Sequence, residues 1–198
     1  MARKRKRAVP RLTADEVVAR AEKKLRQAEF FVGSLAELAQ PAVREHAKFA
    51  EPMEFHMSAS LSAARSAFYI LRDFGGPAFR RAQKAWRRSH GADMDFHQRM
   101  IDLRDEDVHW GRVDAKSVQT WVDARTVRGV TVISSPGVFV EQTNPDGSVV
   151  RAPALSSIPT LYITHAGKDI EATIACRQFI SLLRDLLVEF QRVTGVTP

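Results

Sequence analysis

An arginine and a histidine near the middle of the chain carry side chains suited to acid–base chemistry on a phosphate. Four residues separate them in the segment Arg104-Asp-Glu-Asp-Val-His109. A guanidinium can neutralise a phosphate, and an imidazole can donate or accept a proton near neutral pH. Together they can support attack of an RNA 2′-hydroxyl on the adjacent phosphorus without a metal. Because Asp105 could orient either side chain, we interpret Arg104, Asp105 and His109 as candidate catalytic residues.

The same segment also fits an ordinary helix end. Five positions on an α-helix correspond to about 140° of net rotation, so Arg104 and His109 share a face only if the helix unwinds between them or ends near His109. Gly111 could provide such an end. A histidine near a helix C-terminus can also satisfy the last carbonyl groups. Two interpretations stay open: a catalytic pair, and a solvated, charge-rich helix terminus.

We expect no metal and no cofactor. Glu106 precedes His109 at the spacing used by carboxylate-bridged di-iron bundles, but no second glutamate stands in this relation to a histidine. The single cysteine, Cys176, excludes an internal disulfide and a cysteine-built zinc site. Its apolar surroundings predict a buried structural thiol rather than a nucleophile. The chain has no Gly-x-Ser-x-Gly elbow, no phosphate loop and no dinucleotide fingerprint.

The net charge of +7 is concentrated near the N-terminus. Six of the 30 basic residues lie there, and the other 24 are almost balanced by 23 acidic residues. The six are Arg3, Lys4, Arg5, Lys6, Arg7 and Arg11. We predict a flexible basic tail over residues 1–12, which either contacts nucleic acid through counterion release or acts as a disordered solubilising end.

No apolar run approaches the ~20 residues that a membrane helix needs, and no apolar segment follows the basic start. We therefore expect no membrane association and no secretion. The lone cysteine fits a cytoplasmic location.

A second basic segment, Phe79 to Arg88, combines cations with aromatic residues. Arg80, Arg81, Lys84, Arg87 and Arg88 could hold phosphates. Unpaired bases could stack on Phe79, Trp86, Trp110 and Trp121. The alternative is that the aromatic side chains belong to the core and the arginines form its solvated rim.

Helical periodicity predicts long helices from Thr13 to Pro41 and from Pro52 to Phe74, a short basic helix from Phe79 to Arg88, and another that ends near Trp110. Thr13 and Glu16 form a capping box, and Gly75-Gly76-Pro77 ends the second helix. A last helix is expected over Asp169 to Val193. The predicted apolar stripe of the second helix includes Phe55, and that of the last helix includes Ile174.

Between these helices the pattern changes to short β-branched segments separated by turns. They are Gly129 to Ile133, Val138 to Gln142, Val149-Val150 and Leu161 to Thr164. The predicted fold class is mainly α: a single helical-bundle domain over 13–198, with a small antiparallel β meander inserted at about 128–165, before the last helix.

Two segments resemble the HEPN-like superfamily. They are Glu54-Phe-His-Met-Ser-Ala-Ser-Leu-Ser-Ala-Ala-Arg-Ser-Ala-Phe68 and Leu103-Arg-Asp-Glu-Asp-Val-His109, and the resemblance covers roughly residues 13 to 111. It implies a helical bundle. In many family members an arginine, a polar residue directly after it and a histidine four to six residues on form a metal-independent endoribonuclease site. Arg104, Asp105 and His109 match that motif, whereas the β insertion is not part of the common core.

The resemblance also implies partners. It suggests a homodimer in which two copies of the motif face each other, for which the small residues Ala59, Ala63 and Ala64 suit an interface as well as they suit a core. Our leading hypothesis is an RNA-directed ribonuclease of the toxin or phage-defence type, for which an antitoxin-like protein partner is expected. The alternative is a non-enzymatic binding or scaffold module, and a third hypothesis is nucleic-acid binding through the basic tail alone.

Overall fold

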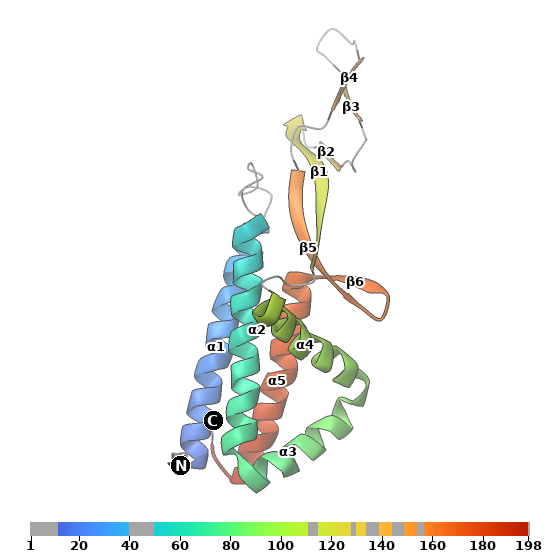
Figure 1. The fold of residues 1–198 in the computed structure, drawn as a ribbon. Helices are drawn as coiled ribbons and strands as arrows, with labels where there is room; N and C mark the ends of the chain where they lie inside the picture. The colour runs from blue at the N-terminus through green and yellow to red at the C-terminus, as the bar shows by residue number, and fades with distance from the viewer. Residues whose placement is uncertain are drawn as a thin grey trace, which may run out of the picture.

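The chain is mainly helical, with antiparallel strands inserted before the last helix (Figure 1). The computed structural model describes the backbone of residues 12–39, 50–110, 115–127, 130–133, 139–143, 149–153 and 157–197. Side chains are described for residues 12–39, 52–103 and 161–197. Three long helices form the bundle: α1 (Ala14–Leu38), α2 (Ala50–Phe74) and α5 (Ala172–Thr194). The predicted mainly α class, with an antiparallel β insertion before the last helix, is confirmed.

The start of α1 follows directly from its sequence. The Thr13 hydroxyl accepts a hydrogen bond from the Glu16 amide at 3.2 Å, and the Glu16 carboxylate accepts one from the Thr13 amide at 2.8 Å. This is the predicted capping box, which satisfies amides that the helix itself leaves unpaired. Every third or fourth residue then packs inward, so α1 buries one continuous stripe. The stripe consists of Val17, Val18, Ala21, Leu25, Ala28, Val32 and Leu35.

The core lies where the inner faces of α1, α2 and α5 meet. Small residues let α1 and α2 approach closely enough for the Ser60 hydroxyl to donate to the Ala28 carbonyl at 3.2 Å. Cys176 is fully buried, and this burial raises the pKa of its thiol to about 12, as expected of a structural cysteine. The largest fully buried side chains of the three helices are Leu25, Leu35, Met57, Leu61, Leu71, Phe179 and Phe190.

Two predicted core residues lie on the outside instead. Phe55 is 63% exposed, because Met53 and Met57 occupy the inward positions at that end of α2. Ile174 is 54% exposed, because Thr173 and Ala175 are the residues of that turn that face inward. Phe55 and Ile174 thus lie next to the buried face of their helix and not on it. Which face of a helix is buried depends on the helices that pack against it.

Two shorter helices, α3 (Gly76–Ser89) and α4 (Met94–Trp110), flank the bundle and are joined by a 3-10 turn at Gly91–Asp93. The turn from α2 into α3 requires both glycines. A side chain at Gly75 would collide with the Leu71 carbonyl and the Phe190 ring, and Gly76 has φ +54°. The predicted boundary after Phe74 is therefore confirmed.

The β region differs from the predicted meander. Its strands are β1 (Ala115–Val127), β2 (Val130–Ile133), β3 (Phe139–Thr143), β4 (Val149–Pro153), β5 (Ser157–His165) and β6 (Lys168–Glu171). One sheet has the order β2-β1-β5-β6, and β3-β4 forms a separate antiparallel pair. The strands thus begin at Ala115 and end at Glu171, outside the predicted bounds of 128 and 165.

Strand β1 was missed because most of its pairing is with β5, which is distant in sequence, and only its last residues pair with the adjacent β2. Ala115 pairs with Ile163 and Trp121 with Ser157, so β5 stabilises β1 across the intervening β2, β3 and β4. A local pattern carries little information on such a pairing. Where β5 meets the helices, Leu161 and Ile163 are buried in the core, and they anchor the sheet to the bundle.

Candidate nucleic-acid interface

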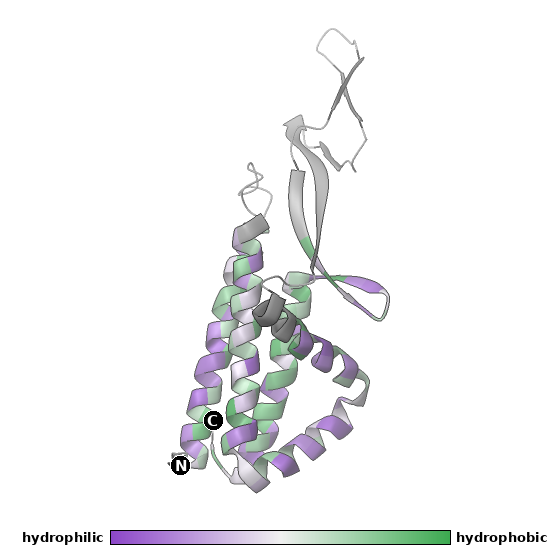
Figure 2. Cartoon of the chain, in the orientation of Figure 1, coloured by the Kyte–Doolittle hydropathy of each residue, from purple (hydrophilic) through white to green (hydrophobic). Residues whose placement is uncertain are grey.

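Helix α3 presents a face dominated by cations. Its inward positions hold Phe79, Ala82 and Trp86, spaced three and four residues apart, and this spacing orients the helix on the bundle. The five basic residues of α3 are all exposed on its outer side, and Figure 2 shows hydrophilic residues along this helix. We call this surface the cationic face: Arg80, Arg81, Lys84, Arg87 and Arg88.

The cationic face carries unbalanced charge. Helix α3 contains no acidic residue, and none of its five cations forms an ion pair with the parts of the chain whose side chains are described. Arg80 and Lys84, like Lys84 and Arg88, stand four residues apart and repel each other. A bound polyanion would relieve this repulsion and release counterions. The face therefore has the electrostatics of a phosphate-binding surface.

Two aromatic residues of this segment cannot stack on bases, which corrects the sequence prediction. Trp86 is 1% exposed, and its indole Nε1 donates to the Leu182 carbonyl of α5 at 2.9 Å. Phe79 is also buried, with its ring against Phe68. Trp86 and Phe79 face inward because burial of a large aromatic ring in the core lowers the free energy of the folded state more than exposure to solvent does. Both residues hold the cationic face in place but do not form part of it.

A buried histidine lies beneath the cationic face, between α3 and α4. The ring of His97 contacts those of Phe68, Trp86 and Phe179, with centroid distances of 5.2, 5.1 and 5.6 Å. Its Nε2 has no hydrogen-bond partner within the described structure. Burial, assisted by the charge of Arg87, lowers the pKa of His97 to about 4. His97 is therefore neutral near pH 7 and joins α4 to the core.

A second basic cluster, on α2, is internally paired. Arg65 donates from Nε and Nη2 to the Tyr69 hydroxyl at 3.0 and 2.6 Å, and the Arg72 guanidinium lies 4.1 Å from the Tyr69 ring centroid. Arg72 also donates to Asp73 at 2.7 Å, and this hydrogen bond raises the pKa of Arg72. Because these arginines already have partners, we do not include them in the interface.

His90 is the C-cap residue of α3, and it was not among the functional residues predicted from the sequence. The Nδ1 of His90 lies 3.1 Å from the Trp86 carbonyl, and its Nε2 lies 3.2 Å from Asp185 Oδ2 of α5. The position of His90 directly after Ser89 is consistent with a helix end. Its contact with Asp185, 95 residues later in the chain, is seen only in the tertiary fold. His90 therefore fixes the last turn of α3 to α5.

The candidate catalytic residues lie in the last turns of α4. Helix α4 is continuous from Met94 to Trp110, so the backbone does not unwind between Arg104 and His109, and about 140° of helical rotation separates these positions. The side chains of Arg104, Asp105, His109 and Trp110 lie outside the described residues, as does that of Trp121. The tail residues Arg3, Lys4, Arg5, Lys6 and Arg7 also lie outside them. Among the residues whose side chains the structure describes, the candidate interface is therefore confined to α3.

No protein-family model, no curated protein and no solved structure matches this chain. Among the helices described, none has the length and apolar character needed to cross a membrane.

Proposed function

We propose that this protein is an RNA-binding, HEPN-like endoribonuclease that needs no metal. The observation that carries the RNA-binding part is the cationic face of α3, which is exposed, free of acidic residues and held rigidly by Trp86. Arginines and a lysine spaced along one side of a helix suit consecutive phosphates of a single strand. The ribonuclease part rests on the resemblance of Arg104, Asp105 and His109 to the family motif.

The proposed reaction is a transesterification in which the 3′ fragment leaves from phosphorus through its 5′-oxygen. His109 accepts the proton of the RNA 2′-hydroxyl as the oxygen attacks the adjacent phosphorus, and Arg104 neutralises the charge that develops on the phosphorane. As the P–O5′ bond breaks, protonated His109 returns that proton to the leaving 5′-oxygen. The products are a 2′,3′-cyclic phosphate and a 5′-hydroxyl. Because α4 is continuous, about 140° of helical rotation separates Arg104 from His109 within one chain, and the motif of a second copy would complete the site.

Incubation with cellular RNA in chelator tests the activity. Wild type should produce fragments that end in 2′,3′-cyclic phosphate, whereas His109→Ala and Arg104→Ala should lose at least about a hundredfold in rate. His56→Ala, which changes a histidine of α2 far along the chain from the motif, serves as the matched control and should cleave like wild type. DNA should stay intact because it lacks the 2′-hydroxyl. Cleavage that stops in chelator would exclude the mechanism.

A second candidate function is RNA binding without cleavage. It is favoured by the continuous α4 helix, which separates Arg104 and His109 within one chain. Under this proposal RNA stays intact with every variant, but gel-shift affinity still depends on Arg80, Arg81, Arg87 and Arg88. The third hypothesis, binding through the basic tail alone, predicts instead that deletion of residues 1–11 abolishes the shift and that changes in α3 leave it unaltered.

A further inference from the structure

The outer side of α5 carries a stripe of exposed residues that combines two aliphatic side chains with one cation and one anion. Ile174 and Val188 are apolar and are 54% and 59% exposed. Ile174 lies seven residues before Ser181, and Val188 lies seven residues after it. Arg177 lies four residues before Ser181, and Asp185 lies four residues after it. All five residues are exposed. Around the axis of an ideal helix, each of them lies within about 40° of their common mean direction. We call these five residues the α5 stripe.

The α5 stripe is complementary to itself. If a second α5 packs against it in the antiparallel sense with the two Ser181 residues facing, Arg177 of one copy meets Asp185 of the other, and Ile174 meets Val188. Each contact then occurs twice, as a twofold axis requires. Serine at the centre is small enough to let the two helices cross closely. A stripe with opposite charges at equal distances from its centre is thus suited to a second copy of this chain.

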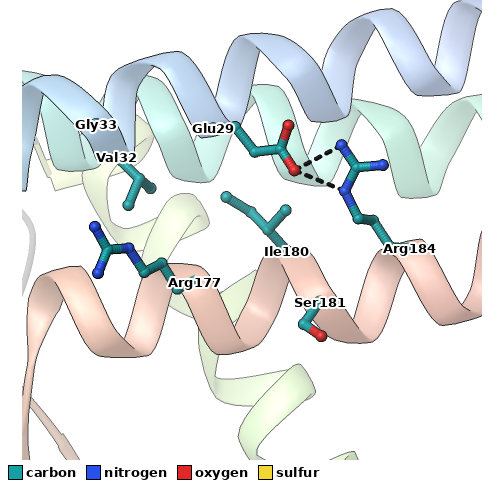
Figure 3. Close-up of a pocket in the computed structure, with 7 residues that line it drawn as sticks. All are labelled: Glu29, Val32, Gly33, Arg177, Ile180, Ser181 and Arg184. Atoms are coloured by element: carbon teal, nitrogen blue, oxygen red, sulfur yellow. Dashed lines mark hydrogen bonds and ion pairs between the residues drawn. The ribbon is translucent and has the colours of Figure 1, made fainter.

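The surroundings leave the stripe accessible. On one side it borders a groove of about 250 Å³ between α1 and α5, whose floor includes Val32 and Ile180 (Figure 3). Glu29 and Arg184 form an ion pair across that groove at 2.6 Å, so Arg184 is already neutralised within its own chain. On the other side His90 contacts Asp185 Oδ2, yet the Asp185 side chain remains 51% exposed. Arg177 and Asp185 therefore remain available for contact with a second copy.

We propose that the α5 stripe is the interface of a homodimer in which two α5 helices pack antiparallel about Ser181. This interface rests on α5 alone and is separate from the contact by which a second copy would complete the α4 site, so its test does not depend on RNA cleavage. One pair of helices buries less surface than a standard protein interface, so the dimer should be weak and its dissociation measurable at micromolar concentrations.

Sedimentation equilibrium over about 1 to 200 µM tests the proposal. Wild type should dimerise, and Arg177→Glu should raise the dissociation constant about tenfold or more, because both ion pairs become repulsive contacts. The double variant Arg177→Glu/Asp185→Arg reverses both partners and should recover most of the affinity. Circular dichroism of each variant establishes that the helices are intact. A wild-type monomer throughout this range, or a dimer that Arg177→Glu does not weaken, would overturn the proposal.

Disulfide cross-linking gives a second, geometric test. In the proposed dimer Ser181→Cys places two thiols together at the twofold axis and should cross-link rapidly under mild oxidation. The native Cys176 does not interfere, since it is buried and its pKa is raised to about 12. Ala19→Cys, on the exposed side of α1, is the matched control. Equal cross-linking of the two variants would contradict an axis at Ser181, whatever the RNA experiments show.

Discussion

Helices α3 and α5 bury similar inner faces but expose opposite kinds of surface. Inside, both contribute aromatic and aliphatic residues to one core, and Trp86 of α3 donates a hydrogen bond to the α5 backbone. Outside, α3 carries cations without an acid, whereas α5 carries both charges and two exposed aliphatic residues. Because packing constrains only the inner faces, the outer faces are free to specify partners. The comparison underlies the two proposals above: a polyanion as the partner of α3 and a second copy as the partner of α5.

The largest expected effect concerns the contact that the two helices share. Trp86→Ala should destabilise the protein by about 3–5 kcal/mol, because it leaves a cavity and removes the hydrogen bond to the Leu182 carbonyl. Urea denaturation measures the change. Ser181→Ala, on the exposed side of α5, is the control and should alter stability by less than about 0.5 kcal/mol. Similar costs for the two variants would mean that α3 does not depend on this anchor.

Acid should weaken the α3 and α4 side of the molecule through His97. The pKa of His97 is lowered from 6.5 to about 4 in the folded protein, so between these values the unfolded chain binds a proton that the native state does not. Stability is therefore fully present above pH 6.5 and falls as the pH drops towards 4, by about 3 kcal/mol from this residue.

His97→Phe keeps an aromatic ring among Phe68, Trp86 and Phe179 but cannot take up a proton. The difference in unfolding free energy between this variant and wild type should grow in favour of the variant from pH 6.5 to pH 4. If the difference in unfolding free energy stays constant from pH 6.5 to pH 4, His97 is not held neutral by burial in the native state. His165→Phe, a substitution on β5, controls for the loss of a histidine as such.

Removal of charge from α3 separates binding from folding. Changing Arg80, Arg81, Arg87 and Arg88 to glutamine should weaken binding of single-stranded RNA about a hundredfold at low salt, with little change in stability. The matched control changes four cations of α1, of which Lys24 is half-buried and the others are exposed: Arg20, Lys23, Lys24 and Arg26. These cations are interspersed with acidic residues. Fluorescence anisotropy measures both sets. Equal losses would indicate that total charge, and not the cationic face, governs binding.

The smallest expected effect is that of salt on the dimer. Raising the salt from about 50 to 500 mM should weaken RNA binding by orders of magnitude, because several phosphates are neutralised. The same change should weaken the α5 dimer only a few-fold, because contact between Ile174 and Val188 is not screened. Parallel titrations by anisotropy and sedimentation compare the two. A dimer as salt-sensitive as the RNA complex would remove the distinction between the two faces.

The sequence predicted features whose causes lie close together in the chain. Thr13 and Glu16 interact across three residues, and Gly76 adopts a positive φ directly after α2, so both boundaries could be predicted. The exposed arginines of α3 were also predicted as a cationic surface. Features that depend on distant partners were missed or misassigned: β1 needs β5, and Phe55 lies outside because Met53 and Met57 fill the core. The arrangement of the Arg104, Asp105 and His109 side chains stays a prediction.

The sequence by itself determined the helical class, the caps, the cations of α3 and the symmetric spacing about Ser181, because each depends on neighbours along the chain or on helical periodicity. Only the tertiary structure decided which side of each helix faces water. It buried Trp86 and Phe79, exposed Ile174, and placed Asp185 beside His90. The physical reason is that burial is shared among helices: an apolar residue becomes core only if a neighbouring element covers it. The two outer faces, and hence the proposed partners, are what the packing of the bundle leaves exposed.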